Sequence, residues 1–163
     1  MAASEVIKHL YDGSLEIADG TGVPVLLSLA FSIGDFKLSG LSADQGEVKP
    51  YKIRGKLQTL RTGPSSEPSG SFSAYLADVS DVADQTLIDF VLKKGSYNGN
   101  KSTTTNGDAY TVDLTWTIEG TDLGDVADHV ITCTDCVVTM DLSEGEPNTI
   151  AFSFTVFGSV TMT

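Results

Sequence analysis

The chain has 163 residues, and its 22 Asp and Glu side chains outweigh 10 Lys and Arg to give a net charge of -12. A chain of this length can form one well-packed core, so we expect a single domain over residues 1–163. An acidic excess repels a phosphate backbone and argues against specific nucleic-acid binding. The 16 Gly and 5 Pro residues are too few for collagen-like or disordered proteins.

Targeting signals are not evident in the sequence. The apolar run at residues 23–33 follows Glu16 and Asp19 rather than a basic segment, and it is too short to cross a bilayer. Two cysteines are too few for the disulfide framework of a small secreted protein. We therefore expect a protein that is made and kept in a cytosol.

Alternation of apolar and polar residues predicts several short strands in the first half of the chain. A loop rich in Pro, Ser and Gly at residues 62–70 reverses the chain direction between the predicted strands at residues 51–61 and 71–77. The predicted strands cover residues 14–18, 25–33, 36–38, 51–61 and 71–77.

One helix is predicted over about residues 82–94. Ser80 or Asp81 can cap its start, and Gly95 is suited to the C′ position after its last turn. Its apolar side chains cover an arc of about 200°, which is wider than one sheet face usually covers. The helix is therefore expected to contact a neighbouring subunit through Ile88 and Leu92, although burial under its own loops is a close alternative.

Long alternating segments dominate the second half. Residues 110–118 alternate without a break, which is typical of a half-buried antiparallel strand, and residues 130–142 supply one long or two short strands. The closing run at residues 150–162 places large apolar groups on one face and small or hydroxyl groups on the other. The predicted fold is mainly β, an antiparallel β-sandwich or barrel with one flanking α-helix.

Catalytic and metal-binding patterns are sparse. The two histidines, His9 and His129, are too few for a metal cluster or a Ser-His-Asp arrangement. Cys133 and Cys136 form a CxxC motif without a second pair, and residues three apart on a regular strand point to opposite faces. Buried thiols are the main interpretation; a metal or redox role would need a bulge at residues 134–135. We expect no enzyme activity and no cofactor.

Half of the basic residues fall in one short segment. The predicted strand at residues 51–61 would place Lys52, Arg54 and Lys56 on one side, opposite the apolar side chains. In so acidic a chain, such a stripe is expected to pair with carboxylates across strands or across a subunit boundary. These three side chains are our candidates for subunit contacts.

The arrangement of elements resembles the major tail protein of long-tailed bacteriophages. The resemblance covers nearly the whole chain as architecture, and it is most specific where a turn at Gly145-Glu146-Pro147 leads into the alternating Phe/Ser strand and then Gly158-Ser159. It implies a tail-tube-like β domain that assembles into hexameric rings, stacked into a tube that conducts the genome during ejection. It also implies a place in the virion tail, after assembly in the host cytoplasm.

A tube that conducts DNA must not hold it. Cations along the bore would trap successive phosphates, so we expect a neutral or acidic lining. It could be the polar face of Thr111, Asp113, Thr115, Thr117 and Glu119, with Asp113 and Glu119 as the acidic candidates, or that of Ser153, Thr155 and Ser159. The expected partners are other copies of the chain and other tail proteins, with no membrane. A non-catalytic β-sandwich that binds carbohydrate or another ligand remains the alternative, and a small β-barrel enzyme ranks below both.

Overall fold

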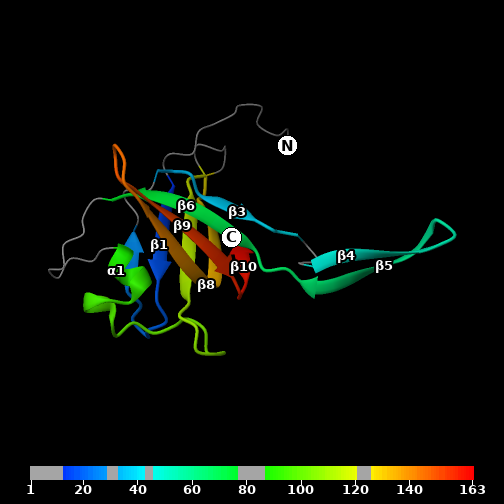
Figure 1. Cartoon of the computed structure of the whole chain (residues 1–163), viewed down its shortest axis with the longest axis horizontal. Helices are drawn as coiled ribbons and strands as arrows, with labels where there is room; N and C mark the ends of the chain where they lie inside the picture. The colour runs from blue at the N-terminus through cyan, green and yellow to red at the C-terminus, as the bar shows by residue number, and fades with distance from the viewer. Residues whose placement is uncertain (1–12, 29–32, 43–45, 77–86, 121–125) are drawn as a thin grey trace.

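The computed structural model describes residues 13–28, 33–42, 46–76, 87–120 and 126–163 (Figure 1). The expected N-terminal part of the helix, with its caps, and residues 29–32 of the strand predicted at residues 25–33 lie outside these residues. The described strands are β1 (Ser14–Ala18), β2 (Leu26–Ser28), β3 (Lys37–Ser39), β4 (Gly46–Ile53), β5 (Lys56–Ser65), β6 (Ser69–Tyr75), β7 (Val112–Ile118), β8 (His129–Ser143), β9 (Thr149–Val156) and β10 (Val160–Met162).

Eight of these strands form one antiparallel sheet in the order β2-β1-β7-β8-β9-β6-β3, with β10 also paired to β8. The 15-residue strand β8 is the centre of the sheet. Its first half lies between β7 and β10, and its second half pairs with β9. A mainly antiparallel β fold with one short described helix confirms the predicted fold class.

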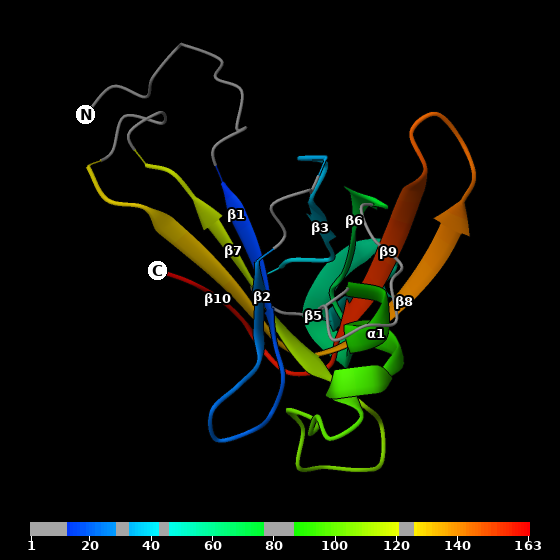
Figure 2. The same ribbon diagram turned by 90° about the vertical axis from the view of Figure 1, so that its left-hand side faces the viewer.

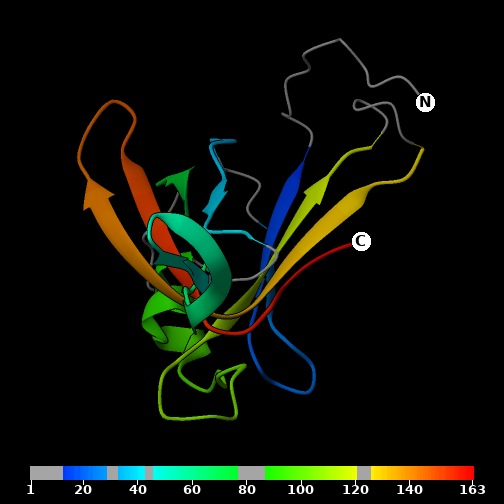
Figure 3. The same ribbon diagram turned by 90° about the vertical axis from the view of Figure 1, so that its right-hand side faces the viewer.

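The sheet bends sharply within β8, so that its two halves diverge as a V (Figures 2 and 3). Asp135 has a left-handed φ of 53°, and the β7–β8 register shifts beside it. The Asp135 amide donates a hydrogen bond of 3.0 Å to the Asp113 carboxylate. On the opposite edge, Gly158 approaches so closely that a Cβ there would lie 2.7 Å from the Thr134 carbonyl oxygen.

The core lies between the halves of the bent sheet and is rich in aromatic rings. Phe72 and Phe152 are fully buried and stack with their centroids 4.8 Å apart. Phe36 bridges to the other half of the sheet, where its centroid lies 4.7 Å from that of Trp116. Such offset and tilted contacts add to the energy of apolar burial.

The closing segment confirms the predicted faces of β9 but not one continuous strand. Ile150, Phe152 and Phe154 are buried, whereas Ser153 on the other face is exposed. Between β9 and β10 the register against β8 shifts by one residue, from Val156 opposite Cys136 to Val160 opposite Cys133, at the bend that contains Asp135.

The strand predicted at residues 51–61 is wrong, because a hairpin turn divides it. Arg54 and Gly55 have φ values of 49° and 78°, which match the two left-handed residues of a type I′ turn. β4 therefore ends at Ile53 and β5 returns from Lys56. A left-handed Arg before the glycine is an uncommon choice, and this concealed the turn.

Helix α1 (Leu87–Leu92) is followed by the 3-10 turn η1 (Gly95–Tyr97). The Lys93 amide bonds to the Phe90 carbonyl and the Lys94 amide to the Asp89 carbonyl, which is the Schellman pattern. Lys93, with φ of 54°, thus takes the C′ position that was predicted for Gly95. Phe90 is fully buried and meets Tyr97 edge to face at 5.3 Å, which anchors the helix to the core.

Candidate functional site

The most exposed feature of the described chain is the β4–β5 hairpin, which projects away from the body (Figure 1). Its strands form a separate two-stranded sheet. Apart from Gly46 and Gly63, every residue of the two strands is exposed. An isolated two-stranded hairpin is marginally stable in water. A ribbon of this kind is therefore suited to pairing with another surface.

The register gives the hairpin two different faces. Side chains directly opposite each other in a ladder share a face. Pro50 lies opposite Leu60 and Val48 opposite Thr62, so one face is mainly apolar. The other face carries the pairs Lys49–Arg61, Tyr51–Thr59 and Ile53–Lys56. We call these the apolar face and the basic face of the hairpin.

Charge divides the molecule into two unequal parts. Five cations and one acid give the hairpin a charge of +4. Because the whole chain has a net charge of -12, the rest of the chain carries -16. The charged residues of the hairpin are Glu47, Lys49, Lys52, Arg54, Lys56 and Arg61. Lys49 lies 3.6 Å from Glu47, an exposed pair of small energetic value. The hairpin is thus a cationic arm on an acidic body.

The three basic candidates for subunit contacts gather at the tip of this arm but do not share one face. Lys56 lies on the basic face opposite Ile53, whereas Lys52 lies on the apolar face opposite Leu57. Arg54 occupies the turn itself. The predicted stripe is therefore wrong as a single face, because the turn at residues 54–55 inverts the alternation on which it was based.

The two helix candidates have different environments. Ile88 is half-buried and packs against the core cluster, so the chain itself uses much of its surface. Leu92 is 45% exposed at the end of the helix, beside Lys93 and Lys94. Of the pair, only Leu92 offers a substantial surface to another molecule.

Of the two lining candidates, Asp113 is the second residue of β7 and Glu119 lies just beyond its end, and both are half-buried. Asp113 uses its carboxylate to hold the Asp135 amide at the bend of β8, which is a structural task. The two carboxylates thus stand at opposite ends of one strand and do not form a cluster.

Between them lies a hydroxyl-rich face whose β7 part, Thr115 and Thr117, was predicted from the sequence as part of a polar face, whereas its continuation on β8 and β10 was not. Thr115 of β7, Thr132 of β8 and Thr161 of β10 are directly paired across three strands. Thr117 extends this row along the same face of β7. The repeated Thr-X-Thr pattern at residues 115–117, 132–134 and 161–163 could have revealed its extension to β8 and β10 in the sequence.

The two cysteines lie at the bend and are buried and free. The irregularity at residues 134–135 that a metal or redox role would need is present, with Asp135 in a left-handed conformation. The Cys136 thiol donates a hydrogen bond to the Cys133 carbonyl at 3.5 Å. Its hydrogen bond to the Cys133 thiol, with burial, raises the pKa of Cys136, and the same bond lowers the pKa of Cys133. No group of three or more His, Cys, Asp or Glu among the described residues is placed to hold a metal ion.

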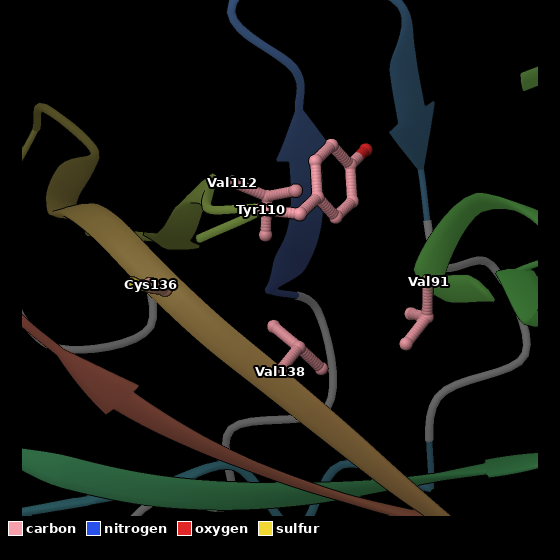
Figure 4. A pocket seen from close by; sticks show the side chains of 5 residues that line it. All are labelled: Val91, Tyr110, Val112, Cys136 and Val138. Atoms are coloured by element: carbon pink, nitrogen blue, oxygen red, sulfur yellow. The ribbon is translucent and has the colours of Figure 1, made fainter. Parts of the chain in front are cut away.

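A small apolar pocket separates helix α1 from the sheet (Figure 4). Val91 of the helix faces Val138 and Val112 across it, with Tyr110 and Cys136 completing the lining. The Tyr110 hydroxyl accepts a hydrogen bond from Asn100 at 3.4 Å. Aliphatic walls without a nucleophile–base pair give this pocket no evident chemistry.

No described helix is long and apolar enough to span a membrane.

No protein-family model and no curated protein matches the sequence. The fold is nevertheless shared with solved structures of injection particles. The chain is similar to a chain in the PVC sheath/tube terminator of an extracellular contractile injection system in its extended state, with 14% identity, a TM-score of 0.59 and 99% coverage of both chains.

Two structures of the anti-feeding prophage are also similar. A chain of its baseplate has 9% identity and a TM-score of 0.54 over 99% of this chain and 97% of its own length. A chain of its tube terminating cap has 12% identity and a TM-score of 0.53 over 100% and 94%. At such low identities these likenesses establish one thing: the chain has the fold found in components of contractile injection particles.

Proposed function

We propose that the protein is a non-catalytic structural component of a phage tail or a related injection particle. The observation that carries this proposal is end-to-end similarity of fold to components of such particles, with 94–100% of each chain covered. The exposed cationic hairpin on an acidic body supports self-association, since opposite charges on one chain favour contacts between copies.

The assembly that we propose is a hexameric ring, stacked with further rings into a tube that conducts the genome. Its partners are copies of itself and other tail proteins, and its place is the virion tail after assembly in the host cytoplasm. The hydroxyl-rich face of Thr115, Thr132 and Thr161 suits the bore, with Asp113 and Glu119 at its margins. Such a lining offers DNA weak neutral contacts and no fixed cations, so DNA can slide.

A ligand-binding β-sandwich is the weaker candidate. Carbohydrate-binding sites need aromatic rings exposed beside polar groups, whereas Trp116 is half-buried and packs against Phe36. The described pocket beneath α1 has aliphatic walls and lacks the convergent polar groups that orient a ligand.

Sedimentation velocity over a wide range of protein concentration tests the proposal. We expect a concentration-dependent population of rings or longer assemblies that shrinks as salt is raised, because the +4 hairpin and the acidic body attract each other through screened charges. A strictly monomeric protein at every concentration, including under crowding, would contradict self-assembly.

A further inference from the structure

We propose that the β4–β5 hairpin of one copy docks on the β8–β9 end of a second copy, in a head-to-tail contact. The β8–β9 end consists of Tyr75, Asp141, Leu142, Glu144 and Glu146. This inference rests on the proposed self-association and identifies the two surfaces that produce it. The argument depends on charge, exposed apolar area and the placement of the two surfaces.

The first step is charge. The basic face of the hairpin presents Lys49, Lys56 and Arg61, all exposed. At the β8–β9 end, Asp141, Glu144 and Glu146 are exposed, and within the part of the chain that the structure describes none of them has a cation within 4 Å. Three carboxylates at one end thus match three cations on one ribbon face. Opposed charges of this kind fix the register of a contact and speed its formation.

The second step is apolar surface. Tyr51 and Ile53 lie on the basic face of the hairpin beside its cations, and they are 53% and 63% exposed. At the β8–β9 end, Tyr75 is 44% exposed on the sheet face that also carries Asp141, and Leu142 is 60% exposed on the opposite face. Leu92, another exposed apolar side chain, is flanked by Lys93 and Lys94, which would repel the cationic hairpin. The β8–β9 end therefore combines exposed apolar groups with the charge sign that the hairpin requires.

The third step is geometry. The hairpin projects from one end of the long axis of the molecule, and the β8–β9 turn lies at the opposite side of the body (Figure 1). A contact between two different patches on opposite sides is heterologous, and repeating it generates a closed ring or an open filament. The same contact also covers a ribbon that is marginally stable alone. One interface thus accounts for both the exposed hairpin and an extended assembly.

Charge reversal on the two surfaces tests the proposal with the full chain. One variant carries Lys56→Glu and Arg61→Glu, and a second carries Glu144→Lys and Glu146→Lys. Each should lose at least about tenfold in association constant, because the pairing becomes a repulsion. A 1:1 mixture should regain assembly, since the native hairpin of the second variant can pair with the native acidic end of the first, and the reversed surfaces can also pair.

A control variant with Lys94→Glu and Lys101→Glu changes the net charge by -4, as the hairpin variant does, but should assemble like the wild type. Circular dichroism and urea unfolding establish that each variant is folded. If the wild type assembles and the Glu144→Lys, Glu146→Lys variant does so equally well, the acceptor surface is overturned while the proposed function stands. A folded mixture that does not recover assembly overturns the pairing in the same way.

Two further outcomes are informative. A wild type that never associates overturns the proposed self-assembly and this contact with it. Retention of a short duplex DNA by the wild type, lost in the Lys56→Glu, Arg61→Glu variant while assembly is unchanged, would make the hairpin a nucleic-acid arm and overturn its role in docking.

Discussion

Replacing Gly158 with Ala should destabilise the protein through the bend in β8. The new Cβ would lie 2.7 Å from the Thr134 carbonyl oxygen and would overlap the Thr134 hydroxyl oxygen, so one strand must move. Overpacking of this kind costs about 1–3 kcal/mol. The shift would also weaken the bond of 2.8 Å from the Ser159 amide to the Thr134 hydroxyl, worth about 0.5–1.5 kcal/mol.

Together these effects predict a loss of about 2–4 kcal/mol in the free energy of unfolding, measured by urea titration followed by fluorescence of Trp116. Gly99→Ala is a matched control, because a Cβ at Gly99 would meet no atom within 4 Å. The control should change stability by less than about 1 kcal/mol. A Gly158→Ala variant within about 0.5 kcal/mol of the wild type would show that the close packing at the bend has no energetic role.

Three further predictions concern the core, the hairpin and the thiols. Phe152→Ala should cost about 3–5 kcal/mol in urea unfolding, because the ring is fully buried and stacked on Phe72, whereas Phe157→Ala at an exposed ring should change little. Replacing residues 47–64 by a short Gly-Ser linker should leave the unfolding midpoint nearly unchanged but abolish assembly in sedimentation, since the hairpin side chains are exposed. Cys136 should react with a thiol reagent near neutral pH only after unfolding, because burial and a raised pKa keep it protonated; rapid reaction of the native protein would contradict this.

Local alternation was a good guide wherever a strand has one buried face. The faces of β9 follow directly from the spacing of Ile150, Phe152 and Phe154, which a core must bury. Prediction failed where both faces of a ribbon are exposed, because burial then gives no signal of direction. The turn at Arg54-Gly55 lacks the usual Asn or Asp, so the sequence offered a long strand in place of a hairpin.

Structural features that depend on residues far apart in the sequence could not be predicted from local patterns. The bend at Asp135 depends on the Asp113 carboxylate 22 residues away and on Gly158 on the opposite edge. The concentration of five of the ten Lys and Arg residues at residues 49–61 is visible in the sequence itself. Their separation onto two faces, and the acidic β8–β9 end as a surface to match them, required the strand register and the relative placement of distant elements.

Electron microscopy of the purified protein at assembly-promoting concentration and low salt is the most direct test of the central claim. We expect rings or stacked tubes with an open bore, and a reconstruction that places Thr115, Thr132 and Thr161 toward the bore and the hairpin across the boundary between copies. A field of monomers would contradict a structural role by self-assembly, and a bore lined mainly by Lys and Arg would contradict the proposed passage of DNA.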